Sequence, residues 1–354
     1  MSAGPATSEV TAPEAGPAEA DPAGDPFGGA AHAAAGSRPP PRGVFELEGR
    51  AAPGLYLVAW AMAIAGCGAI FISLASGGGN GSVVAFVLGI AGLALGMATG
   101  AGSQALQRRA DGRAYAGPSP VLVFGAALAL TLVVGFGIRA LGVVPDGPAA
   151  VLVSVLVSAA ISLGLVALVV VSPGALAWRE MGFRLPGPGE GSAIGDVALG
   201  VALAIPTLFG AGLLAAILVS LLGATPNSPL PPAQDGAGIL VNLFAAAVIA
   251  PLWEEAFFRG FATTAWERSV GARAAIIRGA VFFALIHLAT LVGSDFGTAI
   301  RTAFIAFAVR LPVGLVLGWV FLRRGSLVAP IALHATYNAI PVLLIAIGAG
   351  SITG

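Results

Sequence analysis

Five polar side chains lie within long apolar stretches of this sequence: Glu254, Glu255, His287, His334 and Asn338. An ionisable side chain at the centre of a membrane helix costs at least about 2.5 to 3.5 kcal/mol, so it needs a partner or a polar cavity. The whole chain has only 3 histidines, and two of them belong to this set. These five residues are therefore the candidates for a functional site inside a membrane.

The adjacent acids Glu254 and Glu255 occupy the stretch PLWEEAFFRG. Glu255 precedes Arg259 by four residues, which is the favoured order for an ion pair along a helix. Glu254 points about 100° further round the helix, so it remains free to meet a histidine from another helix. We predict that Glu255 is a structural partner of Arg259 and that Glu254 does the chemistry. The alternative is that both acids pair with arginines at the membrane surface.

Both histidines have a neighbour one helical turn away. His334 and Asn338 project from the same face of a helix, and their N–H groups could stabilise negative charge that develops on a carbonyl oxygen. Phe283 and His287 are also four residues apart, so an aromatic ring lies beside the second histidine.

The spacing of these residues from arginines predicts their depth in the membrane. Each polar residue is a short way along its helix from an arginine: Glu254 is five residues before Arg259, His287 nine after Arg278, and His334 ten after Arg324. At about 1.5 Å per residue, the depths below the arginines are roughly 8, 14 and 15 Å. The three helices should thus present polar groups at nearly one level, in a cavity open to the cytoplasm.

The composition is that of a membrane protein, with 57% hydrophobic and 10% charged residues among 354. Apolar runs of membrane-spanning length recur from residue 54 onward. They cover residues 54–76, 82–101, 119–144, 149–172, 194–222, 238–259, 275–292, 301–322 and 327–349. We therefore predict an all-α, polytopic transmembrane bundle of about eight or nine helices.

The distribution of charge predicts the orientation of the chain. All 17 basic residues are arginines, and those in the connections lie in alternate connections, which should face the cytoplasm. Arg139, Arg301 and Arg310 are exceptions within apolar runs and have no assigned role. The N-terminus then also lies in the cytoplasm of a multi-pass protein in the plasma (inner) membrane. Residues 1–50 are rich in Ala, Gly and Pro and should form a disordered tail. Nucleic acid is not an expected partner, and Cys67 carries no disulfide or metal signal.

These motifs resemble those of the CPBP family of intramembrane proteases, which includes type II CAAX prenyl endopeptidases and bacterial proteins linked to bacteriocin processing or self-immunity. The family pattern is E-E-x-x-x-R, F-x-x-x-H and H-x-x-x-N on successive helices. The chain reads Glu254-Glu255-Ala-Phe-Phe-Arg259, Phe283-Ala-Leu-Ile-His287 and His334-Ala-Thr-Tyr-Asn338. The match covers about residues 245–345. Residues 51–190 then form N-terminal transmembrane helices and residues 191–354 a CPBP-like catalytic core, which the WREMGFR stretch at 178–184 precedes as a connector.

The resemblance implies an endopeptidase in which Glu254 acts as general base on water with help from His287. It assigns the oxyanion site to His334 and Asn338, and supporting roles to Glu255, Arg259 and Phe283. We expect no cofactor. Glu254, His287 and His334 resemble a zinc ligand set, but zinc-dependent intramembrane proteases use H-E-x-x-H, which the chain lacks.

Two other functions are compatible with the same residues. One is a non-catalytic membrane adaptor or immunity protein that keeps the fold and binds a partner. The other is a proton-coupled transporter that uses Glu254 as a relay, although the chain shows no internal repeat. The partners expected for the protease are the lipid bilayer and a peptide or protein substrate, and nothing in the sequence requires that substrate to be prenylated.

Overall fold

The computed structural model describes residues 47, 49–144, 146–186, 192–226, 230–231, 233, 235–290 and 295–348. Nearly all of the predicted tail at residues 1–50 lies outside this part of the chain. The described residues form helices joined by short connections and contain no strand, so the prediction of an all-α bundle is confirmed.

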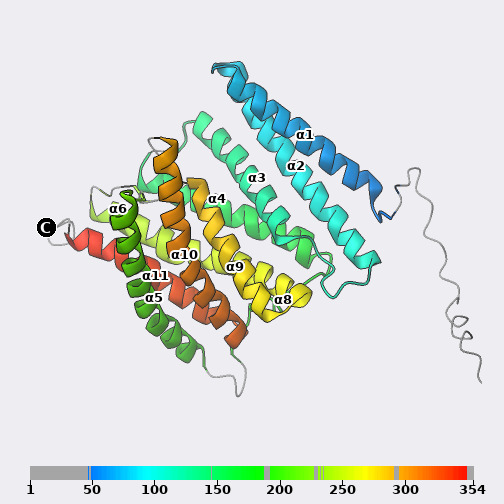
Figure 1. Ribbon diagram of the computed structural model, residues 1–354. Coiled ribbons are helices and arrows are strands. Elements are labelled where there is room, and N and C mark those ends of the chain that lie inside the picture. The colour runs from blue at the N-terminus through cyan, green and yellow to red at the C-terminus, as the bar shows by residue number, and fades with distance from the viewer. Residues whose placement is uncertain are drawn as a thin grey trace, which may run out of the picture. The chain divides into compact units, whose positions relative to one another are not determined.

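The helices follow the predicted apolar runs (Figure 1). They are α1 (Pro53–Ala75), α2 (Asn80–Ala110), α3 (Pro120–Ala140), α4 (Pro148–Val166) with the π-helical η1 (Ala167–Val171), α5 (Ala193–Leu222), α6 (Gly236–Phe244), η2 (Ala245–Ile249), α7 (Ala250–Glu255), η3 (Ala256–Thr263), α8 (Thr264–Val270), α9 (Ala272–Ile286), the 3₁₀ turn η4 (His287–Thr290), α10 (Phe296–Arg324) and α11 (Val328–Gly348).

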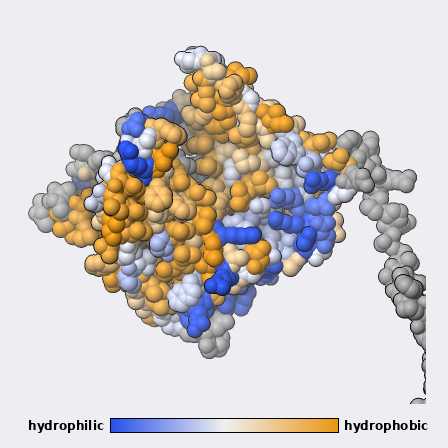
Figure 2. Space-filling model, viewed as in Figure 1, coloured by the Kyte–Doolittle hydropathy of each residue, from blue (hydrophilic) through white to orange (hydrophobic). Residues whose placement is uncertain are grey.

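Elements α6 to α8 form one continuous helix that is interrupted only by π-helical turns. With this helix counted once, the described part of the chain holds 8 helices that are long and apolar enough to cross a membrane. The ninth helix, α9, has only 15 residues. The protein is therefore a multi-pass membrane protein, and its surface is largely apolar in the face that Figure 2 shows.

The helix that carries the two acids is longer than its apolar run. We expected it to end at Arg259, at the cytoplasmic surface, but it continues to Val270 and stops where Gly271 adopts a φ of 83°. The expected end is wrong because Arg259 is buried. Its charge is balanced by Glu255, and its guanidinium lies 4.4 Å from the centre of the Phe283 ring. The alternative in which both acids pair with arginines at the membrane surface fails for the same reason.

Helices α1 and α2 run side by side along most of their length (Figure 1). Glycines allow this approach. A Cβ added to Gly66 would lie 2.7 Å from the carbonyl oxygen of Gly89, and one added to Gly96 would lie 3.0 Å from that of Ala59. Small residues are common at such contacts because no hydrophobic effect drives apolar helices together in lipid, so the helices associate through close backbone packing.

The connector at residues 172–186 packs against the helices of the core. Met181 is fully buried, and the Gly182 carbonyl accepts a hydrogen bond of 3.1 Å from the backbone N–H of Leu327. Arg184 donates from Nε to the Gly325 carbonyl at 2.9 Å. The connector thus fixes the turn between α10 and α11, and so the start of the helix that carries His334.

Candidate active site

The backbone beside the two acids contains an unmatched carbonyl. In η2 the Ala250 N–H bonds to the Ala245 oxygen, five residues back. In the same pattern, the backbone N–H of residue 251 would bond to the Ala246 oxygen. Residue 251 is a proline, however, and proline has no backbone N–H. The side chain of Asn338 supplies the missing donor, with Nδ2 at 2.8 Å from the Ala246 oxygen. Asn338 therefore joins α11 to the helix of the acids at the point where Pro251 interrupts its hydrogen bonds.

Glu255 is the centre of a buried network. Its Oε1 accepts hydrogen bonds from Arg259 Nη1 at 2.9 Å and from His334 Nδ1 at 2.7 Å. Phe283, beneath the Arg259 guanidinium, also touches both histidine rings edge-on or tilted, with centroids 4.5 Å from His287 and 5.8 Å from His334. The ion pair predicted between Glu255 and Arg259 is present, and it extends to His334, which sequence spacing did not indicate.

Glu254 faces the two histidines. Its Oε2 lies 3.9 Å from His287 Nε2 and 3.9 Å from His334 Nε2. All three side chains are largely buried, with exposed fractions of 14%, 25% and 5% for Glu254, His287 and His334. The predicted convergence of these three residues is thus observed, although the depth of Glu254 was counted from Arg259, which is buried and does not mark the membrane surface.

The hydrogen bonds of the imidazoles decide which atoms face Glu254 as acceptors. His287 Nδ1 lies 2.7 Å from the Phe283 carbonyl, and His334 Nδ1 bonds to the Glu255 carboxylate. Because those oxygens accept, each Nδ1 carries the proton, and the Nε2 of a neutral ring has only a lone pair. A separation of 3.9 Å is too long for a direct hydrogen bond, but it suits a water molecule that bridges the groups. Glu254 Oε2 has no hydrogen-bond partner among the described residues.

A metal ion is a second possible occupant of such a donor set. Zinc sites hold nitrogen and oxygen ligands at about 2.0 to 2.2 Å from the ion. Among the residues that the structure describes, no group of three His, Cys, Asp or Glu side chains has the geometry of a metal site. That the site works without a cofactor stays a prediction.

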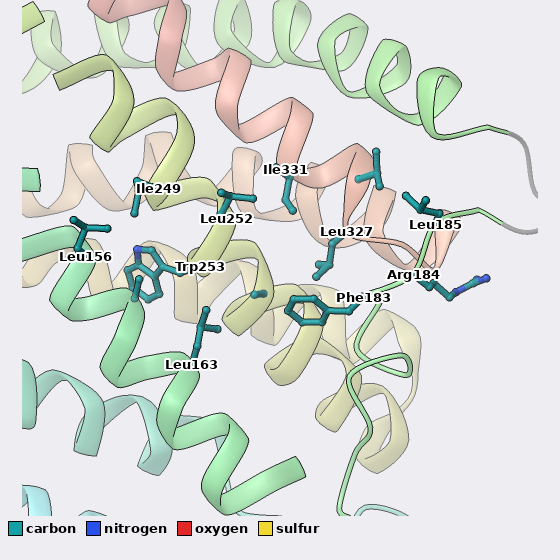
Figure 3. Close-up of a pocket in the computed structure, with 14 residues that line it drawn as sticks. Leu156, Leu163, Phe183, Arg184, Leu185, Ile249, Leu252, Trp253, Leu327 and Ile331 are labelled. Carbon is teal, nitrogen blue, oxygen red and sulfur yellow. The ribbon is translucent and has the colours of Figure 1, made fainter. Parts of the chain in front are cut away.

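An apolar groove of about 680 Å³ lies along the helix that carries the acids. In Figure 3, Trp253, Leu252 and Ile249 line it from the helix of the acids, Leu156 and Leu163 from α4, Ile331 from α11, and Phe183 from the connector, where the neighbouring Arg184 side chain points away. Trp253 immediately precedes Glu254, and Arg184 is the charged residue of this lining. The groove thus offers a largely apolar space along the helix of the acids, and its lining includes neither acid and neither histidine of the site.

Sequence reasoning did not find the partner of Asn338, although a signal was present. Pro251 stands within a run that otherwise reads as a membrane helix, and an interior proline always leaves one carbonyl without its donor. Which carbonyl is left depends on the local π-helical turn, and that turn is visible only in the structure.

Comparison with known proteins gives one match. Residues 236–340 match the sequence model of the family described as type II CAAX prenyl endopeptidase Rce1-like. The matched range contains all four predicted catalytic residues. No curated protein and no solved structure matches the chain. Residues 236–340 are therefore similar to the Rce1-like family, and this match supports the resemblance to the CPBP family that the three motifs indicated.

Proposed function

We propose that this protein is an intramembrane endopeptidase that hydrolyses a peptide bond of a membrane-associated or lipidated substrate with water activated by Glu254. The observation that supports this most strongly is the position of Glu254 Oε2, 3.9 Å from the Nε2 atoms of both His287 and His334. A carboxylate and an imidazole that share one water are the usual means of general-base hydrolysis.

In this proposal, the water donates one hydrogen bond to Glu254 and one to His287, and His287 holds it in place without taking a proton. Glu254 takes its proton as the water oxygen bonds to the substrate carbonyl carbon, and the carbonyl oxygen becomes an oxyanion. The C–N bond then breaks, and the proton on Glu254 passes to the leaving amine. The products are a new carboxyl terminus and a new amino terminus.

The oxyanion needs hydrogen-bond donors. His334 can donate from Nε2 when its ring carries a second proton, and the Glu255 carboxylate at Nδ1 stabilises that charged ring. The amide of Asn338 has two N–H groups, of which one bonds to Ala246. The second N–H is the donor that we assign to the oxyanion.

The apolar groove supports the choice of substrate. Apart from Arg184 its lining is apolar, with side chains from α4, from α11 and from the helix that carries Glu254. We assign the groove to the lipid chain or to the apolar segment that holds the substrate in the membrane.

Terminal-peptide mass spectrometry tests this function. Membranes from cells that lack the protein are complemented with the wild-type chain, with Glu254→Gln or with Glu267→Gln at matched expression. Glu267 is an exposed acid on the same continuous helix and serves as the control. New termini should appear with the wild type and Glu267→Gln but not with Glu254→Gln. Identical termini in all three would contradict the proposal and favour a binding or transport function.

A further inference from the structure

A second ion pair with a buried acid lies outside the candidate active site, at the start of α5. Asp196 is in the first turn of this helix and is fully buried. Its Oδ1 accepts a hydrogen bond of 2.5 Å from Nε of Arg324, the last residue of α10. Its Oδ2 has no hydrogen-bond partner among the described residues. A buried pair with an unsatisfied oxygen contributes little net stability, so its main effect is to fix the two helices relative to each other.

The pair joins α5 to the turn that starts α11. Arg324 is followed directly by residues 325–327, and α11 begins at Val328. In this turn, Ser326 is fully buried, and its hydroxyl donates to the Arg184 carbonyl at 3.0 Å. The turn is thus attached to the connector on one side and, through Arg324 and Asp196, to α5 on the other.

One helical turn further along α5, Gly200 touches α11 directly. Asp196 and Gly200 are four residues apart and therefore share one face of the helix. A Cβ added to Gly200 would clash with the Ala329 carbonyl oxygen and would lie 2.8 Å from the backbone nitrogen of Leu333. Leu333 is fully buried and directly precedes His334. The backbone of α5 therefore sets the position of α11 beside this histidine.

The position of His334 leaves little room for movement. Its Nδ1 lies 2.7 Å from the Glu255 carboxylate, and its Nε2 lies 3.9 Å from that of Glu254. A shift of α11 by about 1 Å would lengthen the first contact beyond hydrogen-bond range. Misplacement of a catalytic group by that distance can lower a rate about 100-fold. The packing of α5 thus controls a residue of the site, although α5 itself carries none of the predicted site residues.

We infer that Asp196 is a positioning residue of the active site, which acts through α11 and touches no reacting atom. With Arg324 it holds α5 in the register that seats Gly200 against α11. This contact in turn keeps His334 within hydrogen-bond distance of Glu255. The inference rests on the proposed function for the role of His334, but the position of the imidazole can be measured without any cleavage.

Histidine NMR spectroscopy tests the inference without a substrate. The chain has 3 histidines, so the full-length protein with ¹⁵N-labelled imidazole rings gives few signals, and single histidine substitutions assign them. In Asp196→Ala the Nδ1 proton of His334 should exchange with water at least about 10-fold faster, because its hydrogen bond to Glu255 is lengthened or lost. Gly200→Ala should have the same effect. The ring signals of His287, which follows α9, should stay as in the wild type.

Two controls separate a change of position from a general loss of stability. Gly212→Ala adds the same methyl group to α5 at a position where a Cβ has no neighbour within 4 Å, so it should leave His334 unchanged. Gly89→Val disturbs the contact of α1 and α2, and it should leave the proton of His334 protected although the protein unfolds more easily.

Two outcomes would overturn the inference. One is a folded Asp196→Ala or Gly200→Ala in which His334 gives the same signals and the same proton exchange as in the wild type. The other is a Gly89→Val that speeds the exchange as much as Asp196→Ala does. If Asp196→Ala does not fold, the double variant Asp196→Leu with Arg324→Met takes its place, because it leaves no charge of the pair without its partner. A Glu254→Gln variant that still cleaves would contradict the proposed function alone, since these signals do not depend on cleavage.

Discussion

The α1–α2 pair and the site formed by α7, α9 and α11 are both built from apolar helices, but different interactions hold them together. Helices α1 and α2 meet backbone to backbone through Gly66, Gly89 and Gly96, with no buried charge between them. The site helices are joined by Glu255, which binds both Arg259 and His334 in a fully buried position.

The difference follows from the solvent. Lipid tails are as apolar as leucine, so an apolar helix face gains little from meeting another one, and small residues must bring the backbones close. A buried ion pair contributes little net stability, but it fixes geometry, and breaking it leaves an uncompensated charge. We therefore expect changes in α1–α2 to affect stability alone, and changes in the Glu255 network to affect stability and cleavage together.

Removing Glu255 should have the largest effect on stability. Glu255→Ala leaves Arg259 buried without its partner, which should lower the free energy of unfolding by about 3 to 5 kcal/mol and abolish cleavage. Unfolding in mixed micelles measures the first effect. The double variant Glu255→Leu with Arg259→Met removes both charges, so it should recover most of the stability while cleavage stays absent, because His334 has lost its support. A double variant as unstable as Glu255→Ala would contradict this account.

Asn338 should contribute to stability through the Ala246 carbonyl. Asn338→Ala leaves that buried acceptor unsatisfied, at a cost of about 1 to 3 kcal/mol. Pro251→Ala restores an N–H to the helix, so the same substitution should cost clearly less in that background. Equal costs in both backgrounds, measured by unfolding, would show that Pro251 does not create the need for Asn338.

The glycine contact of α1 and α2 should affect stability only. In Gly89→Val the side chain would meet Ile70 and the Gly66 carbonyl at under 3 Å, which should cost about 1 to 3 kcal/mol of unfolding free energy. Gly68→Val is the control, since a Cβ there has no neighbour within 4 Å. Both folded variants should cleave at the wild-type rate, and a lost activity in Gly89→Val alone would link α1–α2 to the site.

The smallest effect should come from the ion pair at the surface of the connector. The backbone N–H of Ala177 and the Arg268 guanidinium hold the pKa of Glu180 below its ordinary value of 4.5. A lowered pKa stabilises the folded protein above pH 4.5, and that stability is lost as the pH falls through the folded pKa. Glu180→Gln should therefore unfold more easily at pH 7 by less than about 1 kcal/mol, and the difference should vanish in acid. If the difference in unfolding free energy between the wild type and Glu180→Gln grew as the pH fell, it would contradict a lowered pKa of Glu180.

The sequence predicted the helical runs, the convergence of Glu254 with two histidines, and the Glu255–Arg259 pair. The runs and the ion pair depend on spacing along single helices, which the sequence contains. The depth of Glu254 was counted from Arg259, which is buried, so the convergence was predicted from a starting point that the structure corrects. The extension of the helix to Val270 was missed because the sequence does not distinguish a buried arginine that is paired with an acid from an arginine at the membrane surface.

A double-mutant cycle on Glu254 and His287 tests the central claim most directly. The wild type, Glu254→Gln, His287→Ala and the double variant are reconstituted in liposomes with the substrate that the terminal-peptide experiment identifies. If both residues act on the same water, the loss of Glu254 already removes the contribution of His287 to the rate. The double variant should therefore cleave no more slowly than Glu254→Gln alone. A double variant slower by the product of the two single losses, or a Glu254→Gln variant that cleaves like the wild type, would contradict the account.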